Sequence, residues 1–338
     1  MLARATRPVN LARKQLRGFA LAAAGGLCYA CRMKIAILGA GALGCYYGAR
    51  LAEAGHELSF IGRSTYEPLQ AQGLRVESPE GDVYLPHVRA FRHARDCGAV
   101  DLVFVCWKTT CNELLPEALP PLLGAETEVV SLQNGMGNAE QIARLLPAER
   151  VFIGLCFVCC MMDEPGVVRH LADGNIRFAP LAATAAGEQR AQRLAELLTA
   201  ARVPSTAHRH PEEIQWTKLT WNIPFNGLCL AHGGIDVQQL FALPGEGARA
   251  RAVMEEVCAA AEARGFALPR DVVDWQMERT AKMGPFVPSS AVDFLRGRPV
   301  EYQAIWGEPL ARAQAAGVAV PEFERLACDI RRRLGMEA

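Results

Sequence analysis

The most specific chemical signature in this 338-residue sequence is a glycine-rich run, Gly39-Ala40-Gly41-Ala42-Leu43-Gly44. It has the spacing G-x-G-x-x-G, follows an apolar run directly and precedes a helical pattern. In this context the first glycine allows a tight turn, the second lets the backbone approach a pyrophosphate, and the third lets the helix pack close to the strand. Amide groups at the helix N-terminus would then bind the phosphates. The run predicts a dinucleotide-binding turn, and the alternative is a glycine-rich turn that binds nothing.

The residues after the next apolar run bear on which dinucleotide would bind. Enzymes that use NAD place an acidic residue there to bind the ribose 2′-hydroxyl. This chain has no acid in Phe60-Ile61-Gly62-Arg63-Ser64, and Arg63 stands where a 2′-phosphate would lie. A guanidinium offers a planar fork of donors to phosphate. The sequence therefore favours NADP (NADPH) over NAD, unless Arg63 is an ordinary solvated arginine.

Two further polar residues follow buried strand-like runs. Lys108 comes after the apolar run at 100–106, and Asn134 comes after the run at 128–132. Open α/β sheets bind ligands outside the carboxyl ends of their strands. Lys108 could add positive charge for the phosphate, and Asn134 could hold the nicotinamide ribose or a substrate. Equally, Asn134-Gly135 could be a turn signal and nothing more.

A polar stripe runs through an apolar segment in the second half of the chain. Lys218, Asn222 and Asn226 recur at steps of four, which places them along one face of a helix. Such groups must be solvated in a cleft or hydrogen-bonded. Pro224 lacks an N–H group and would interrupt or kink this helix. The alternative is a lysine that reaches solvent beside capping asparagines.

A second polar group contains Ser289, Asp293 and Glu301. We expect Pro299 to open a helix at its first position, which puts Glu301 in the first turn. An acid there is favoured by the helix dipole in any case, so its presence alone does not demand a function.

The elements that must position these residues change in character along the chain. The first half alternates β-rich runs with helical stretches, which is typical of a parallel sheet covered by helices. Antiparallel pairing is expected at one side. Strands are predicted at 34–38, 57–61, 74–77, 83–85, 100–106, 128–132, 151–161, 167–171 and 175–179. A helix is predicted at 43–54.

After a predicted linker at 204–211 the chain is almost entirely helical in pattern. Helices are predicted at 212–230, 246–264, 270–282, 299–316 and 322–334. The sequence therefore predicts an α/β protein with a dinucleotide-binding domain at 33–205 and a helical substrate domain at 210–335. The cleft between them is the expected site.

Residues 1–32 form a basic extension ahead of this pattern. They carry six basic residues and no acid, followed by an apolar stretch that resembles a signal peptide. Three interpretations stay open: a start codon assigned upstream of Met33, an organelle presequence, or a secretory signal. We favour the first, because Met33 leads directly into a strand.

Composition excludes several classes of protein. The 36 basic and 36 acidic residues balance, so no charge footprint for nucleic acid is present. No apolar run reaches the length needed to span a membrane. The 12 cysteines lie mostly in apolar runs, where free cysteine behaves as a small buried hydrophobe, and no metal site is expected. These features predict a reduced, cytoplasmic protein.

Taken together, the motifs resemble the ketopantoate reductase (2-dehydropantoate 2-reductase) family over residues 33–335. The resemblance rests on Gly39–Gly44, Lys108 in Cys-Trp-Lys-Thr, Asn134-Gly-Met-Gly, Trp216-Thr-Lys-Leu-x-x-Asn222-x-x-x-Asn226, and Ser289-x-x-x-Asp293 leading to Gly297-Arg-Pro-x-Glu301. It implies a Rossmann-type domain and an all-helical domain, as in 6-phosphogluconate-dehydrogenase-like reductases. It also implies NADPH-dependent reduction of ketopantoate to pantoate, in pantothenate biosynthesis.

The resemblance assigns a role to each matching residue. Lys218 would be the general acid. The substrate's hydroxyl and carboxylate would be held by Asn222, Asn226, Ser289 and Glu301. Arg63 and Lys108 would contact the 2′-phosphate of NADPH, and Asn134 would lie between cofactor and substrate.

Departures from the family pattern lie near the expected substrate pocket and bear on substrate identity. The chain has Gly227-Leu-Cys-Leu-Ala-His after Asn226, Ser290-Ala-Val before Asp293, and Tyr302-Gln303 after Glu301. Two alternatives to a ketopantoate reductase therefore stay open. One is a related β-hydroxyacid dehydrogenase acting on another oxo acid, and the other is a non-catalytic NADPH-binding sensor. The sequence also leaves open whether the chain forms a homodimer.

Overall fold

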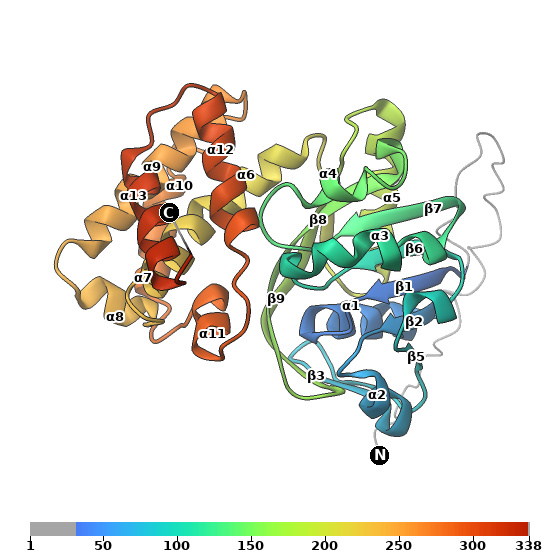
Figure 1. Ribbon diagram of the computed structural model, residues 1–338. Coiled ribbons are helices and arrows are strands. Elements are labelled where there is room, and N and C mark those ends of the chain that lie inside the picture. Colours follow the sequence, from blue (N-terminus) through green and yellow to red (C-terminus); the bar gives the residue numbers. More distant parts are fainter. Residues whose placement is uncertain (1–31, 337–338) are drawn as a thin grey trace, which may run out of the picture.

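The computed structural model describes residues 32–336, so the predicted extension, apart from Arg32, lies outside the described residues. The chain folds into a Rossmann domain built on a mixed ten-stranded sheet, followed by a helical domain (Figure 1). The strands are β1 (Lys34–Leu38), β2 (Glu57–Ile61), β3 (Leu74–Glu77), β4 (Val83–Leu85), β5 (Arg89–Phe91), β6 (Val100–Val105), β7 (Leu123–Ser131), β8 (Val151–Glu164), β9 (Val167–Pro180) and β10 (Ser205–Ala207). This confirms the predicted fold class.

The strand order indicates where a ligand is expected to bind, at the end of β1. The order is β4-β3-β9-β8-β7-β6-β1-β2-β5, with β10 pairing with β9. Strand β1 pairs in parallel with β2 on one side and with β6 on the other, so the direction of the strand order reverses at β1. Ligands of open α/β sheets bind in the crevice at such a reversal. The predicted antiparallel pairing is present between β8 and β9, and between β3 and β4.

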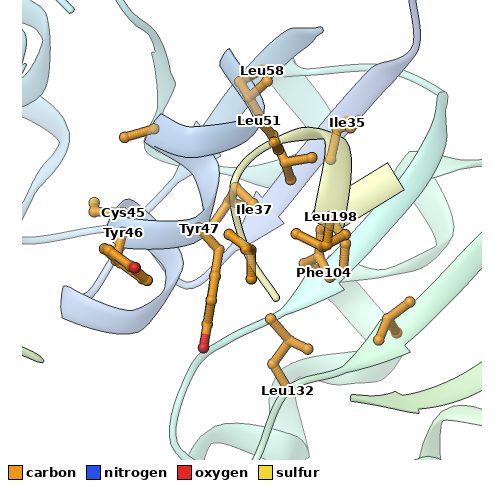
Figure 2. Close-up of a cluster of buried hydrophobic side chains, with 14 of the residues drawn as sticks. Ile35, Ile37, Cys45, Tyr46, Tyr47, Leu51, Leu58, Phe104, Leu132 and Leu198 are labelled. Atoms are coloured by element: carbon orange, nitrogen blue, oxygen red, sulfur yellow. The ribbon is translucent and has the colours of Figure 1, made fainter. Parts of the chain in front are cut away.

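Helices cover both faces of the sheet. They are α1 (Ala42–Glu53), α2 (Tyr66–Gln72), α3 (Leu115–Ala118), α4 (Asn138–Ile142) and α5 (Ala185–Ala200), with short 3₁₀ turns η1 (Ala94–Asp96), η2 (Thr109–Leu114), η3 (Pro120–Leu122) and η4 (Ala148–Arg150). Side chains of a strand alternate between faces. Ile35 and Ile37 therefore pack with α1 and α5, whereas Ala36 and Leu38 pack with α3 and α4. Figure 2 shows part of the hydrophobic cluster that contains Ile35 and Ile37.

The helical domain has a core of its own. Its helices are α6 (Pro211–Trp221), α7 (Gly227–Ala231), α8 (Val237–Ala242), α9 (Glu246–Ala263), α10 (Val272–Ala281), α11 (Ser289–Leu295), α12 (Glu308–Ala315) and α13 (Pro321–Arg333), with π-helical turns η5 (Asn222–Asn226) and η6 (Gln303–Gly307). Trp216 and Trp306 are fully buried in this core. Within residues 32–336, no helix has the length and apolar character required to cross a bilayer.

Two local expectations differ from the structure, and a third is confirmed. The predicted linker contains β10, because its backbone extends the sheet beside Ile176–Phe178. The helix predicted at 212–230 is interrupted by η5 at Pro224, as expected, because proline cannot donate a backbone hydrogen bond. Pro299 does not open a helix: the π-helical turn starts at Gln303, and Glu301 precedes it with its carbonyl accepting from Ile305 N. The favourable effect of the helix dipole on an acid in a first helical turn therefore does not explain the presence of Glu301.

Candidate active site

The glycine loop follows β1 and has the shape that a pyrophosphate requires. A Cβ on Gly39 would lie 2.4 Å from Trp107 N, and one on Gly44 would lie 2.4 Å from the carbonyl oxygen of Gly39. Both glycines are therefore needed for the close packing of the loop. A Cβ on Gly41, in contrast, would meet no atom within 4 Å. Among the described residues, Gly41 thus borders open space, which fits the close approach of a ligand to its backbone.

The first turn of α1 is suited to an anion. It contains no acidic side chain, and its N-cap residue, Gly41, supplies no capping side chain. The N–H groups of a first helical turn have no partner inside the helix, and the helix dipole adds positive potential there. The loop therefore fits the phosphates of a dinucleotide.

Arg63 lies two residues beyond β2 and is exposed. Within residues 32–336 its guanidinium forms no ion pair or hydrogen bond, so it is available to a ligand. Gly62 beside it packs against the loop, since a Cβ there would lie 3.0 Å from Ala40 Cβ. This contact holds the backbone before Arg63 next to the glycine loop.

Asn134 lies in the loop after β7, and a network of amide side chains holds this loop. Asn138 Nδ2 donates to Asn134 O at 2.9 Å, and Asn112 Nδ2 donates to Asn138 Oδ1 at 3.1 Å. Asn112 Oδ1 in turn accepts from Gln133 Nε2 at 2.7 Å. The loop also contacts the helical domain, because Met136 N donates to Ala304 O at 2.9 Å. Asn134 is thus fixed where the two domains meet.

Lys218 reaches from α6 to this loop. Its Nζ donates to Asn134 Oδ1 at 2.8 Å and to Cys156 O at 2.6 Å. The same ammonium lies 5.7 Å from the centre of the Phe157 ring. Burial lowers the pKa of Lys218. The Cys156 thiol and the Glu301 carboxylate act to raise this pKa, and the Lys108 ammonium lowers it further. Lys218 is therefore a positioned ammonium that gives up its proton more readily than a free lysine.

The side chains of Asn222 and Asn226, the two asparagines of the polar stripe, differ in their hydrogen bonding. Asn226 is buried, and its Oδ1 accepts from Ser290 N at 2.9 Å and from Ser289 Oγ at 3.4 Å. This leaves Asn226 Nδ2 as a donor. Asn222 is 7% exposed, and within the described residues its side chain makes no hydrogen bond. Its amide is therefore free to bind a substrate.

The π-helical turn keeps this stripe together. Residues spaced by four drift around an α-helix of 3.6 residues per turn. A π-helical turn contains more residues, with i→i+5 hydrogen bonds, and so reverses that drift. Trp306 Nε1 donates to Ile223 O at 3.0 Å and satisfies a carbonyl in the turn.

Glu301 and Lys108 meet across the junction of the domains. Lys108 Nζ lies 2.7 Å from Asp293 Oδ2 and 3.2 Å from Glu301 Oε2, and Thr109 N donates to Glu301 Oε1 at 2.8 Å. We expected Lys108 to contact the 2′-phosphate. That contact stays untested, and in the structure the Lys108 ammonium is paired with two carboxylates of the helical domain. We refer to Lys108, Asn134, Lys218, Asp293 and Glu301 as the interdomain site.

Sequence profiles identify the family. A profile described as "Ketopantoate reductase PanE/ApbA" matches residues 35–183, and the profile of its C-terminal region matches residues 212–332. Together they cover well over half of the chain and both sides of the site. This chain belongs to the ketopantoate reductase family.

Individual members of the family agree with this assignment. A 2-dehydropantoate 2-reductase from Nostoc sp. is 36% identical and aligns over 87% of this chain and 92% of its own length. The crystal structure of 2-dehydropantoate 2-reductase from Geobacter metallireducens is 39% identical in sequence and has a TM-score of 0.85. The matched region covers 88% of this chain and 99% of that chain.

The fold extends beyond ketopantoate reductases. A ternary structure of D-mandelate dehydrogenase with NADH and anilino(oxo)acetate has a TM-score of 0.81 at 23% identity. It covers 89% of this chain and 98% of its own. At this identity the similarity shows the fold alone.

Several groups in or next to the interdomain site were not among the site residues predicted from the sequence. Asp293 was noted only as part of a motif, although it is 3% exposed and pairs with both Lys108 and Arg298. Thr109 N and Cys156 O are backbone groups, so the residue type at these positions could not have identified them. A buried acid within a family motif was the signal that could have identified Asp293.

Proposed function

We propose that this protein reduces 2-dehydropantoate (ketopantoate) to pantoate with NADPH, as a step of pantothenate biosynthesis. The observation that carries the proposal is the position of Lys218, whose Nζ is held by Asn134 Oδ1 and Cys156 O at the junction of the two domains. That position lies beside the loop after β7, and the charge of the Glu301 carboxylate acts to raise the Lys218 pKa.

Lys218 is proposed as the general acid. Bound NADPH supplies the hydride that reduces the 2-oxo carbon. Negative charge then develops on the substrate's carbonyl oxygen, and a positioned ammonium stabilises this charge and donates a proton. Two fixed acceptors, Asn134 Oδ1 and Cys156 O, hold the Lys218 ammonium in one place before reaction. The lowered pKa favours release of the proton.

The polar groups around Lys218 are proposed to bind the two ends of the substrate. The free amide of Asn222 and the Nδ2 group of Asn226 can donate to the substrate's carboxylate or hydroxyl. Ser289 lies at 3.4 Å from Asn226 Oδ1 and belongs to the same group. Glu301 is proposed to accept a hydrogen bond from the substrate hydroxyl.

The choice of NADPH rests on Arg63. Its guanidinium is exposed and has no partner within residues 32–336. No acid stands at the end of β2 to bind a ribose 2′-hydroxyl. A cytoplasmic location of the reaction stays a prediction from the sequence, which does not decide whether the chain forms a homodimer.

Steady-state oxidation of NADPH by the full-length protein with ketopantoate, beside an NADH control, tests the proposal. We expect turnover with ketopantoate and a higher kcat/KM with NADPH than with NADH. Turnover of other 2-oxo acids with none of ketopantoate would contradict the substrate. Tight NADPH binding without turnover of any oxo acid would show a sensor instead.

A further inference from the structure

The pairing of Lys108 with Asp293 and Glu301 connects segments that are far apart in the chain. The separations are 185 and 193 residues, and the contacts run from the end of β6 to α11 and to the segment before η6. Both carboxylate oxygens of Glu301 are held by the Rossmann domain: Oε2 by the Lys108 ammonium and Oε1 by Thr109 N. Glu301 is therefore fixed from the opposite domain, not by its own.

Burial makes these contacts important for the two acids. The side chains of Asp293 and Glu301 are 5% and 4% exposed, whereas that of Lys108 is 44% exposed. A buried carboxylate is unfavourable unless it is paired and hydrogen-bonded. Asp293 has a second cation in Arg298, at 2.9 Å. Within the described residues, Glu301 has Lys108 as its sole ion-pair partner.

The two lysines of the interdomain site differ in protonation. Burial by itself lowers the pKa of Lys108, but the Glu301 and Asp293 carboxylates outweigh it and raise that pKa above its usual value. The pKa of Lys218 is lowered, in part by the charge on Lys108. Lys108 thus stays a cation over the pH range in which Lys218 changes its charge.

We propose that Lys108 is a positioning residue that fixes Glu301 and closes the helical domain onto the Rossmann domain, and that it does not select the 2′-phosphate of the cofactor. The inference rests on the proposed function, because Glu301 is there the group that accepts from the substrate. Two of the three Nζ hydrogens of Lys108 are directed to Asp293 and Glu301. The exposed Arg63 is left to recognise the phosphate.

Substitution of Lys108 separates the two roles through kinetics. Lys108→Met should raise the KM for ketopantoate about tenfold, since it leaves Glu301 buried without its cation. A larger effect is not expected, because Lys108 is partly exposed and solvent screens its charge. The KM for NADPH and the preference for NADPH over NADH should change less than about twofold. Lys108→Arg should recover most of the loss, because a guanidinium can also bridge two carboxylates.

The pH profile supplies a readout that a purely structural role would not move. Lys108→Met removes a charge that lowers the pKa of Lys218, and it leaves Glu301, which raises that pKa, without a competing partner. The basic limb of kcat against pH should therefore move to higher pH. Arg298→Met is the matched control: it removes the exposed cation from Asp293, leaves the Glu301 contacts in place and should leave this limb unchanged.

Equilibrium measurements keep the inference testable even if ketopantoate is not the substrate. The NADPH dissociation constant, from fluorescence titration, should be unchanged in Lys108→Met, while amide exchange at 109–114 and 293–307 should become faster. A native protein that fails to turn over ketopantoate would contradict the proposed function alone. A selective loss of NADPH affinity in Lys108→Met, with NADH affinity and amide exchange unchanged, would overturn the role of Lys108.

Discussion

The Gly39–Gly44 loop follows β1, and the interdomain site takes Lys108 and Asn134 from the segments after β6 and β7, but different forces hold the two regions. The loop is defined by close backbone approach, since a Cβ at Gly39 or Gly44 would lie 2.4 Å from a backbone atom. The interdomain site is defined by charged and amide side chains from segments more than 80 residues apart, such as Lys218 and Asn134. Changes in the loop should therefore act on folding and cofactor binding, and changes in the interdomain site on chemistry.

Loss of the Lys218 ammonium should have the largest effect. Lys218→Ala removes the proposed proton donor, so kcat should fall about 10²- to 10⁴-fold. The NADPH dissociation constant should stay near the native value, because the glycine loop is untouched. Lys218→Arg is the matched control: a guanidinium keeps the charge but does not release its proton, so kcat should stay low. Near-native turnover by Lys218→Ala would contradict the assignment of the chemistry to the interdomain site.

A pair of glycine substitutions should separate binding from folding within the loop. Gly41 has an extended backbone, and its Cβ would point into open space, so Gly41→Val should leave Tm nearly unchanged. The added side chain would occupy space that the pyrophosphate needs, and the NADPH dissociation constant should rise about 100-fold.

Gly44→Val provides the contrast, because its Cβ would collide with Gly39 O and with Ile37 Cγ2 at 2.7 Å. Thermal unfolding should show a loss of roughly 1–3 kcal/mol or more. Equal loss of stability in both variants would refute the assignment of open space at Gly41.

Arg63→Met should reduce the preference for NADPH over NADH. Loss of a guanidinium–phosphate contact at an exposed site should cost about 1–2 kcal/mol, or roughly a tenfold loss in kcat/KM with NADPH. Values with NADH should stay within about twofold of native. An equal loss with both cofactors would place the 2′-phosphate elsewhere.

The pH dependence should give the smallest effect. Reduction requires protonated Lys218, so kcat should be constant at lower pH and fall as pH rises through the Lys218 pKa. Because burial lowers that pKa, the fall should occur below the value of about 10.4 for a free lysine. Glu301→Gln removes a charge that raises the pKa and should move the fall to still lower pH. A shift to higher pH would contradict the proposed electrostatics.

Local patterns in the sequence predicted the loop better than the interdomain site. The glycine spacing directly after an apolar run predicted β1, the turn and α1 from adjacent residues, although the contact that requires Gly39 is with Trp107, in a distant part of the chain. The strands at 34–38, 57–61, 74–77 and 83–85 were predicted with the same bounds that the structure shows. The patterns that predicted these strands lie within short segments of the chain, although β1 pairs with β6 and β3 pairs with β9.

The pairing of Lys108 with Asp293 and Glu301 could not be predicted in this way. Neither the type of Lys108 nor its neighbours indicate an acid 185 or 193 residues further along. Pro299 illustrates the same limit, since a favourable first-turn position was available but residues 299–301 form no regular helix or strand. There the contacts of Glu301 with the other domain outweigh the local helical preference.

The most direct test of the account follows the hydrogen that the substrate gains. Ketopantoate is incubated with the native protein and NADPH that carries deuterium on the transferred face of nicotinamide C4, and the product is analysed by mass spectrometry and NMR. We predict pantoate one mass unit heavier, with the deuterium at C2. Lys218→Ala should form the same deuterated product about 10²- to 10⁴-fold more slowly, because it lacks the proton donor but not the hydride donor. No deuterated pantoate from the native protein would contradict the proposed reduction.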